Sequence, residues 1–572
     1  MEVDATGRAT KTLRPGEKCP TAPVVKLVFS RSDPLGRNPT VCFDYPPSLG
    51  VVRDYSGLIV TTVDAQELSL FYRTSWERNC VKNAFAAAGF FRTRKKCAWH
   101  LAWAKPVPKT QFERFRGDHA QAFNHFPDPW VIGRKDRLMK TLANCRRRFG
   151  ASYDFFPEGF SLPDQLDAFR RALERNETFI AGTFPSSVSS YRDDAGRRKS
   201  ATLGPLWIMK PPASACGRGI RVLTHRDACK LCEDARKKYV TDPLLLGPNG
   251  GESYKFDLRL YVVVTSLDPL RIYLFKEGIT RFCTAAYSLK NPKNRFAHLT
   301  NYSINKSSDG FVENADAQRA DAGSKWSLSA LIRRLQEQQL LDDPETLMRQ
   351  IRAIICKTII AAEAHLTPLL HQFAGQCSCY ELFGFDLMLD SKLRPWLIEV
   401  NVSPSLMGGS PLDRRIKGLL LSDTFHLVGL QVPMTSFRRS KTMRVTTVNR
   451  QLHEVVLDPA VERFETAHLD LFTASDWDIV RSMDDEMDRR GHFERIFPAS
   501  SASAQAAVEE TADYSRFFTC QRYANSLCAK WLQTPRSIRQ RLVRQHSASS
   551  NPRPAPPVAS RSRKSIPASS VR

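Results

Sequence analysis

The segment from Gly384 to Leu406, GFDLMLDSKLRPWLIEVNVSPSL, limits the possible folds more than any other part of the chain. Apolar and other residues alternate on both sides of a polar break at 391–394, which is the pattern of two half-buried strands. If these runs pair as a hairpin, Asp386 lies opposite Glu399, and Asn401 shares their face because side chains on a strand repeat every second residue. The sequence therefore places two carboxylates and an amide where a sheet normally holds apolar side chains.

The whole chain of 572 residues is long enough for roughly two to four domains, and its 42% hydrophobic content is ordinary for a globular protein. No run reaches the roughly 18 consecutive apolar residues of a membrane-spanning helix, and the polar start MEVDATGRATKTLRPGEK does not resemble a signal peptide. The 14 cysteines show no disulfide-like framework, and the CxxC at Cys229 and Cys232 has no second pair at zinc-finger spacing. We therefore predict a soluble, intracellular protein with reduced thiols and no membrane partner.

The formal net charge of +25 favours a polyanionic partner such as nucleic acid, an anionic membrane surface or an acidic protein. No acidic residue occurs from Ser515 to Arg572, where arginine and lysine recur among serine, proline and alanine, as in disordered tails. A second basic stretch, Arg414 to Arg444, directly follows the hairpin. A merely solvated surface is the alternative for either cluster. Nucleic-acid binding is disfavoured because no helix-turn-helix, zinc-finger or RNA-sheet motif is present.

Helix-like and strand-like patterns are mixed along the chain, which predicts an α+β fold. Helical spacing occurs at 75–90, 163–176, 325–339 and 347–366, strand patterns occur at 206–210 and 258–266, and a loop is expected at 185–204. The predicted segments are an irregular N-terminal extension (1–60), an N-terminal α/β part (61–205), a catalytic core (206–430), a basic and partly helical C-terminal region (431–535) and a disordered basic tail (536–572).

A second chemical motif is the stretch WIMKPPASACGRGIRVL, from Trp207 to Leu223. An apolar strand pattern ends at Lys210, and a loop of small residues containing Gly217 and Gly219 follows. Small residues let backbone N–H groups approach phosphate oxygens, and a lysine supplies a point charge. The stretch has neither the P-loop spacing nor GxGxxG, and an ordinary glycine-containing turn between strands is the alternative interpretation.

Together the two motifs predict a nucleotide site. Carboxylate and amide oxygens are hard ligands suited to Mg²⁺, which completes its octahedron with phosphate oxygens and water. Further polar residues lie between the motifs, and each alone is equally compatible with a surface charge or a turn cap. They are Lys255, Asp257 and Arg259 on one face of YKFDLRLYV, Arg281 in TRFCTAAY, and Thr300, Asn301, Tyr302 and Ser303 in HLTNYSIN.

The order of these motifs closely resembles the tubulin tyrosine ligase-like family, specifically its polyglutamylase branch. The resemblance spans about Asn124 to Leu420, is weaker through the N-terminal part and is absent from the tail. It implies an ATP-grasp-like catalytic core with mixed sheets, in which ATP lies between two α+β subdomains. The segments that carry it are NHFPDPWVIGRKDRL, WIMKPPASACGRGI, YKFDLRLYVVVTSLDPLRIYLFKEGITRF, HLTNYSIN, SKWSL, ELFGFDLMLD and PWLIEVNVSPSL.

The resemblance also implies roles for individual residues. Asp386, Glu399 and Asn401 match the ligands of a pair of Mg²⁺ ions, and Lys210 and Arg259 match catalytic residues. The implied ATP contacts are Lys210, Gly217, Lys255, Phe256, Asp257, Thr300 and Asn301, and the implied glutamate contacts are Arg281, Tyr302, Ser303 and Lys325.

The activity implied by the resemblance is tubulin polyglutamylation, in which ATP drives the ligation of free L-glutamate to glutamate side chains of acidic tubulin tails. A monomer acting in the cytoplasm and cytoskeleton is expected, with the cilium, flagellum and basal body as candidate locations. The choice between α- and β-tubulin, and between starting and lengthening branches, stays open. The alternatives are a catalytically impaired protein of the same fold that binds microtubules or acidic proteins, and a ligase for another amino acid such as glycine.

Two departures from the family pattern keep the impaired alternative open. Cys216 stands where the family usually has an arginine, and a thiol cannot supply a fixed cationic fork. Arg218, two residues on, is a candidate to compensate. The residues before Tyr239 are charged, with Lys237 at the expected glutamine beside adenine. Either the adenine pocket is altered or a strand is lost there. Arg281 and Lys325 argue against a glycine donor because they suit a donor with an additional carboxylate.

Overall fold

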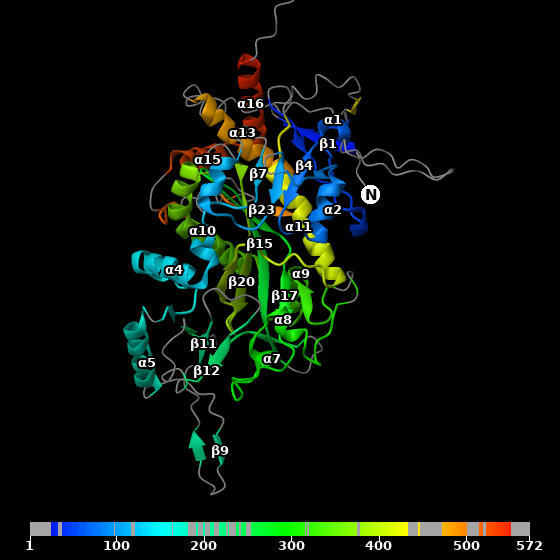
Figure 1. Cartoon of the computed structure of the whole chain (residues 1–572). Coiled ribbons are helices and arrows are strands. Elements are labelled where there is room, and N and C mark those ends of the chain that lie inside the picture. The colour runs from blue at the N-terminus through cyan, green and yellow to red at the C-terminus, as the bar shows by residue number, and fades with distance from the viewer. Residues whose placement is uncertain are drawn as a thin grey trace, which may run out of the picture.

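The central sheet of the protein is built around one long strand, β15 (Tyr254–Leu267), whose residues are buried along almost the whole length. β20 (Glu381–Leu389) pairs with one edge of β15, while β16 (Leu270–Phe275) and β17 (Ile279–Phe282) pair with it in antiparallel register. Figure 1 shows these strands in the middle of the molecule. Within the described residues the sheet has eight strands and is completed by β14 (Leu245–Leu246), β18 (Lys325–Ser327), β21 (Pro395–Asn401) and β23 (Phe493–Phe497).

The computed structural model describes the larger part of the chain. Cys216, Cys229, Cys232 and residues 433–443 of the basic stretch lie outside the described residues, as does everything before 24 and after 550. The described ranges are 24–31, 37–95, 98–115, 121–162, 164–180, 190–192, 198–200, 206–210, 217–224, 227, 236–238, 242–247, 253–314, 316, 320–373, 378–432, 444–446, 472–499, 514–518 and 522–550.

The predicted hairpin is present as β20 and β21. The strands pair antiparallel with Asp386 opposite Glu399 and Gly384 opposite Asn401, and the register shifts just after Asp386. The turn is stabilised by Asp390, whose Oδ1 accepts hydrogen bonds from the backbone N–H of Lys392 at 3.0 Å and Arg394 at 2.9 Å. The predicted register is therefore confirmed, and with it the grouping of the two carboxylates.

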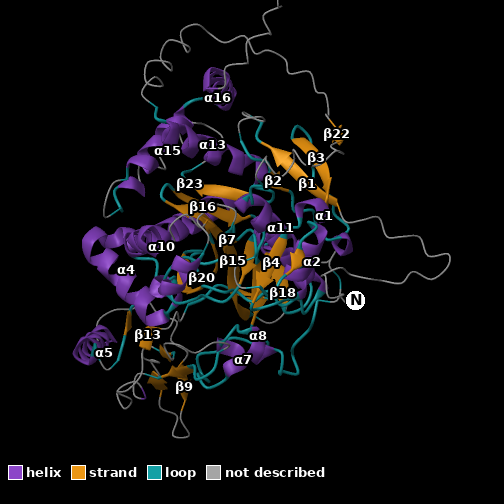
Figure 2. Cartoon of the chain, turned by 45° about the horizontal axis from the view of Figure 1, so that its top comes forward, coloured by secondary structure: helices purple, strands orange, loops and turns teal. Residues whose placement is uncertain are grey.

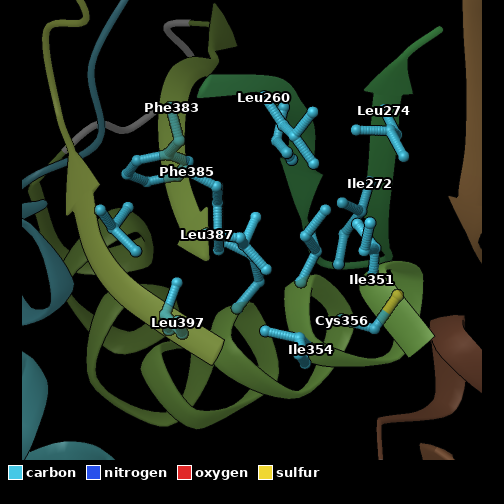
Figure 3. Packing of buried hydrophobic residues seen from close by; sticks show 14 of the residues in the cluster. Leu260, Ile272, Leu274, Ile351, Ile354, Cys356, Phe383, Phe385, Leu387 and Leu397 are labelled. Atoms are coloured by element: carbon cyan, nitrogen blue, oxygen red, sulfur yellow. The ribbon is translucent and has the colours of Figure 1, made fainter. Parts of the chain in front are cut away.

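Helix α10 (Pro344–Phe373) covers one face of the central sheet. Figure 3 shows Ile351, Ile354 and Cys356 of this helix beneath Leu260 and Phe385 of the sheet. The helix is long and apolar enough to cross a membrane by length and composition alone. Because residues such as Ile351 and Cys356 are fully buried against the sheet, this apolar face belongs to the hydrophobic core.

The other face of the sheet packs against α11 (Pro411–Val428), and α2 (Asn79–Ala87) packs against α11 in the same hydrophobic cluster. Alternation along β15 explains the two layers, because Leu260 points into the α10 layer while Tyr261 points into the α11 layer. Helices and sheets are thus mixed through the molecule, and Figure 2 shows this mixture. The α+β prediction is confirmed.

The prediction of an irregular extension over 1–60 is wrong where the described residues from Val24 onward form strands. β1 (Val24–Phe29) pairs with β3 (Ile59–Asp64), and Val25 and Leu27 are fully buried in the core beside α11. The short strand VVKLVF is rich in valine and other apolar residues, which is a strand signal, but the prolines around it indicate irregular structure. The same four-stranded sheet contains β2 (Thr40–Val41) and β22 (Arg444–Thr446).

A five-stranded sheet and a small four-stranded sheet complete the sheet architecture around the site. The first has parallel pairs and the order β19-β7-β6-β4-β5, and the second has antiparallel pairs and the order β12-β11-β13-β8. The first contains β4 (Phe71–Thr74), β5 (Phe91–Arg92), β6 (Leu101–Trp103), β7 (Ala122–Phe123) and β19 (Ser378–Cys379). The second contains β8 (Gly159–Phe160), β11 (Trp207–Met209), β12 (Arg221–Leu223) and β13 (Arg236–Lys238).

Two predictions about the region near the small sheet need correction. A loop was expected over 185–204, but β9 (Ser190–Arg192) and β10 (Arg198–Ser200) form an antiparallel pair there. The charged segment before Tyr239 retains a strand, since β13 pairs with β11 in the register Ile208 to Lys237. The alternative that a strand is lost before Tyr239 is therefore excluded. The other alternative, an altered adenine pocket, stays open.

The prediction of a disordered tail over 536–572 is wrong for its first part, because residues 536–550 form a helix. Helix α16 (Arg536–Ser550) packs with α13 (Ala474–Arg489) and α15 (Tyr523–Gln533) around Trp477 and Trp531. In Figure 1 these helices lie at the opposite end of the molecule from β11 and β12. The apolar residues of α16 that are buried in this cluster, Ile538, Leu542 and Val543, recur at helical spacing, but the serine-rich composition of the tail obscured them.

The remaining elements connect these layers or lie on their surfaces. They are α1 (Ala65–Leu68), α3 (Trp130–Gly133), α4 (Lys135–Phe149), α5 (Leu166–Ile180), α7 (Arg295–His298), α8 (Tyr302–Asn305), α9 (Leu328–Glu337) and the 3₁₀ helices Pro47–Leu49, Lys109–Arg114 and Gly150–Tyr153.

Candidate active site

The centre of the candidate site is an ion-pair network between β15, β17 and β20. Arg259 lies opposite Asp386 in the β15–β20 register. Its Nε donates to Asp386 Oδ1 at 2.5 Å and its Nη2 donates to Oδ2 at 3.0 Å, which is the bidentate geometry that a guanidinium favours. Arg281 Nη2 donates to the same Oδ2 at 2.8 Å. The predicted catalytic residue and the predicted metal ligand are therefore in direct contact.

The same network continues to the predicted ATP-binding residues. Arg281 also holds Asp257, with Nε to Oδ1 at 2.8 Å and Nη2 to Oδ2 at 2.6 Å. Thr300 Oγ1 donates to Asp257 Oδ2 at 2.6 Å. Two carboxylates and two guanidiniums alternate in one buried network of side chains, and this network has no net charge when all four groups are ionised.

The pKa of Asp386 shows how strongly this network acts. Burial by itself would raise the pKa of the carboxyl, since desolvation disfavours the charged form. The adjacent Arg259 and Arg281 guanidiniums more than offset burial and hold the pKa of Asp386 well below its usual range. The carboxylate is therefore ionised at neutral pH, as a metal ligand must be.

Glu399 and Asn401 lie next to this network on β21. Asn401 Nδ2 donates to Glu399 Oε1 and to the carbonyl oxygen of Gly384, both at 3.3 Å. Glu399 Oε2 also pairs with Lys135 Nζ at 3.2 Å. Lys135 begins helix α4 and was not among the predicted site residues, although it lies inside the NHFPDPWVIGRKDRL segment of the resemblance. Its role depends on the packing of α4 against β21, which no local pattern reveals.

The predicted oxygen ligands of Asp386, Glu399 and Asn401 fit a Mg²⁺ ion. Within the described residues no three side chains from His, Cys, Asp and Glu gather into a metal cluster. Mg²⁺, however, is normally held by one or two carboxylates together with substrate phosphates and water, not by a complete protein cage. Asp386 and Glu399 on directly paired positions, with the Asn401 amide beside them, match that requirement.

The predicted phosphate side of the site contains two buried lysines. Lys210 directly follows β11, and burial lowers its pKa, while Glu399 acts in the opposite direction. Lys255 Nζ donates to the His298 carbonyl oxygen at 3.0 Å, and burial lowers its pKa to about 8. A buried ammonium gains stabilisation when an anion arrives beside it, so both lysines are suited to phosphate.

The predicted phosphate loop packs closely on α8. Gly217 has a φ of +71°, and a Cβ there would lie 2.5 Å from Ile304 Cδ1 and 3.1 Å from Asn301 Oδ1. Glycine is therefore required both by backbone conformation and by space. The contact brings the predicted residues Gly217 and Asn301 together. Phe256 is different, because its side chain lies in the core against Phe282, with ring centroids 5.5 Å apart. Only its backbone can face a nucleotide on the Asp257 side.

The predicted glutamate contacts divide into two groups. Arg281 belongs to the buried ion-pair network, whereas Lys325 Nζ lies 3.8 Å from the centre of the Tyr302 ring. Lys325 Nζ also donates to Asp413 Oδ2 at 2.6 Å, and Lys417 Nζ reaches Asp413 Oδ1 at 2.8 Å. The predictions missed Asp413 and Lys417, both on α11, because their meeting with β18 depends on tertiary packing. Lys417 also lies within the predicted basic stretch from Arg414 to Arg444, but this lysine is buried.

Comparison with known proteins identifies the family of the chain. Residues 114–439 match the Tubulin-tyrosine ligase family. The chain is 36% identical over 484 residues to the human protein named tubulin monoglutamylase TTLL4, which covers 80% of this chain and 36% of that protein. It is 34% identical over 449 residues to mouse tubulin polyglutamylase TTLL5, covering 73% of this chain and 31% of that protein.

A nematode relative matches over a larger share of its own length. The Caenorhabditis elegans protein named tubulin polyglutamylase ttll-4 is 29% identical over 508 residues, which cover 85% of this chain and 76% of that protein. By contrast, the chain spans about a third of the length of the mammalian relatives.

Proposed function

Because the chain belongs to the tubulin-tyrosine ligase family, we propose that it is an ATP-dependent ligase with an ATP-grasp-like core that adds glutamate to tubulin. The new bond is an isopeptide bond to a glutamate side chain in an acidic tubulin tail. Relatives named tubulin monoglutamylase and polyglutamylase support this substrate class. The observation that carries most weight is the buried ion-pair network of Asp257, Arg281, Asp386 and Arg259, in which Asp386 lies opposite Glu399.

The proposed reaction has two steps. An acceptor side-chain carboxylate attacks the γ-phosphorus of ATP, which releases ADP and leaves an acyl phosphate. The amino group of free L-glutamate then attacks the acyl carbon, phosphate leaves with the bonding electron pair, and the amine loses a proton. A pair of Mg²⁺ ions held by Asp386, Glu399 and Asn401 would supply charge neutralisation at the phosphates.

The side chains of the protein contribute positioning and charge. Lys210 and Lys255 would hold the phosphates, with Gly217, Thr300, Asn301 and the backbone of Phe256 as further nucleotide contacts. Arg259 is held by its bidentate contact with Asp386, so its guanidinium would need little reorientation to stabilise phosphoryl charge as that charge develops. Because the positive charge is fixed before the reaction, little reorganisation is needed.

The donor pocket would use Tyr302, Ser303, Lys325 and Arg281. Asp413 lies between Lys325 and Lys417, so this trio carries one net positive charge when all three are ionised. Free glutamate carries one net negative charge, whereas glycine carries none. The charge balance therefore favours glutamate over glycine as the donor.

The proposed partners are tubulin in microtubules, free L-glutamate and ATP, and the proposed acting form is a monomer in the cytoplasm. Cilia, flagella and basal bodies are candidate locations on the resemblance alone.

The test is ATP consumption by the full chain with Mg²⁺. We expect sustained ADP release, over many turnovers, that requires both glutamate and tubulin and that is lost when glycine replaces glutamate. ADP release with glycine at the same rate would contradict the donor assignment. Microtubule binding without any glutamate-dependent ADP release would instead identify the impaired binding protein.

A further inference from the structure

A strongly basic cavity of about 790 Å³ lies beside the candidate active site. Arg218, Lys293, Arg295 and Lys306 line it, together with polar groups that include Ser303. None of the described residues that line this cavity is acidic. Its volume is within the range of pockets that hold small ligands or short segments.

The walls of the cavity are continuous with the site. Arg218 follows Gly217, and Arg295 Nη2 donates to the Gly217 carbonyl oxygen at 3.3 Å. Another part of the wall is α8, which carries Ser303 in the cavity and begins at Tyr302. An extended ligand in the cavity would therefore reach both the predicted phosphate loop and the predicted donor contacts.

The cavity differs from the catalytic network in its charge balance. Arg259 and Arg281 are neutralised by buried aspartates, whereas Lys293, Arg295 and Lys306 form no ion pair with any acid in the described part of the chain. All four cationic residues of the cavity are solvent-exposed. Like charges brought together without counter-charges repel one another, so an anionic ligand relieves that repulsion on binding.

We propose that this basic cavity binds the acidic segment of the acceptor that flanks the modified glutamate. A run of carboxylates matches four cations around one cavity, and the acceptor is the one substrate of the proposed reaction that supplies a polypeptide with carboxylates on either side of the reacting group. The assignment rests on the proposed function, since it places the acceptor next to the ligation chemistry. A basic cavity at this position would also make the protein prefer acceptors with acidic residues next to the modified glutamate.

The test compares two double substitutions in the full chain. Lys293→Gln with Lys306→Gln removes two exposed cations of the cavity. Arg94→Gln with Lys95→Gln removes two exposed cations beyond β5, on the five-stranded sheet, and is the matched control for net charge. Binding of a labelled oligoglutamate peptide is measured by fluorescence anisotropy at physiological salt without ATP or glutamate, and acceptor KM is measured separately.

We expect the cavity variant to weaken peptide binding and to raise acceptor KM by roughly 2- to 30-fold, as the loss of two exposed charge pairs predicts. The KM for ATP and the kcat should stay unchanged, and the control should bind the peptide like the wild type. Equal losses in both variants, no loss in the cavity variant, or a change in ATP affinity alone would overturn the assignment.

The outcomes also separate this inference from the proposed function. If the wild type ligates glutamate but the cavity variant keeps normal binding and KM, the ligase stands and the acceptor site is wrong. If the cavity variant loses peptide binding but the wild type adds no glutamate, the anion site stands and the ligase is wrong.

Discussion

Replacing the two predicted metal carboxylates by their amides separates metal binding from fold stability. Glu399→Gln and Asp386→Asn each remove an anionic oxygen ligand with little change in volume. Removing a residue that merely supports a metal ligand typically costs 10- to 100-fold in metal affinity or activity, so loss of a ligand itself should lower glutamate addition by about 100-fold or more. Both variants should fail in catalysis for the same reason.

Their stabilities should differ, because the two carboxylates have different surroundings. The Asp386 side chain is 3% exposed and accepts three hydrogen bonds from two arginines, so breaking this buried network should cost about 3–5 kcal/mol. The Glu399 side chain and its partner Lys135 are each 18% exposed and share one ion-pair contact at 3.2 Å, so the loss of that pair should cost less than breaking the Asp386 network. Glu399→Gln is therefore the cleaner test of the metal site.

The assay pairs Mg²⁺ titration of ATP binding with thermal unfolding of the full chain. We expect Glu399→Gln to bind Mg²⁺ and ATP weakly while melting within a few degrees of the wild type, and Asp386→Asn to melt clearly lower. Near-normal turnover in Glu399→Gln would refute the metal assignment. Equal melting temperatures for the two variants would refute the energetic role of the buried network.

Three further predictions follow from other parts of the site. Burial lowers the pKa of Lys255 from 10.5 to about 8, so ATP affinity should fall as pH rises through about 8. The stability contribution of this lysine should rise between pH 8 and 10.5, because the unfolded chain still binds the proton in that range. The Lys255→Arg variant should show a flatter pH dependence of the ATP Kd. Lys325→Gln should raise the KM for glutamate by about 10-fold or more, as expected for loss of a charge-assisted hydrogen bond to the donor, with the KM for ATP unchanged; an unchanged KM for glutamate would remove Lys325 from the donor site. Cys216→Arg should raise the turnover rate by about 10- to 100-fold if a missing guanidinium limits the reaction, and an unchanged rate would mean that the loop is built around the cysteine.

The hairpin could be predicted from the sequence because all the necessary signals are local. Alternation with period two determines which residues share a face, and the polar break sets the turn, so the pairing of Asp386 with Glu399 followed directly. The implied nucleotide residues on β15 are also grouped by alternation, and the same rule explains why the side chain of Phe256 points away from Asp257 into the core.

The counter-charges in the site could not be predicted in this way. Arg259 meets Asp386 only because β15 pairs with β20, which lies 127 residues further along the chain. Lys135 and Asp413 reach the site through the packing of α4 and α11. The sequence suggested free cations for the donor, whereas Arg281 and Lys325 are both paired with aspartates. Such pairing depends on tertiary contacts, which cannot be predicted from the local periodicity of the sequence.

The most direct measurement is mass spectrometry of tubulin tails after incubation with the full chain, ATP, Mg²⁺ and isotopically labelled L-glutamate. We expect tail peptides to gain the mass of one or more labelled glutamate residues, with fragment ions that place the addition on a glutamate side chain. The Glu399→Gln variant should give no such peptides. Unmodified tails with the wild-type chain, under conditions in which it binds both ATP and microtubules, would contradict the assignment of a glutamate ligase.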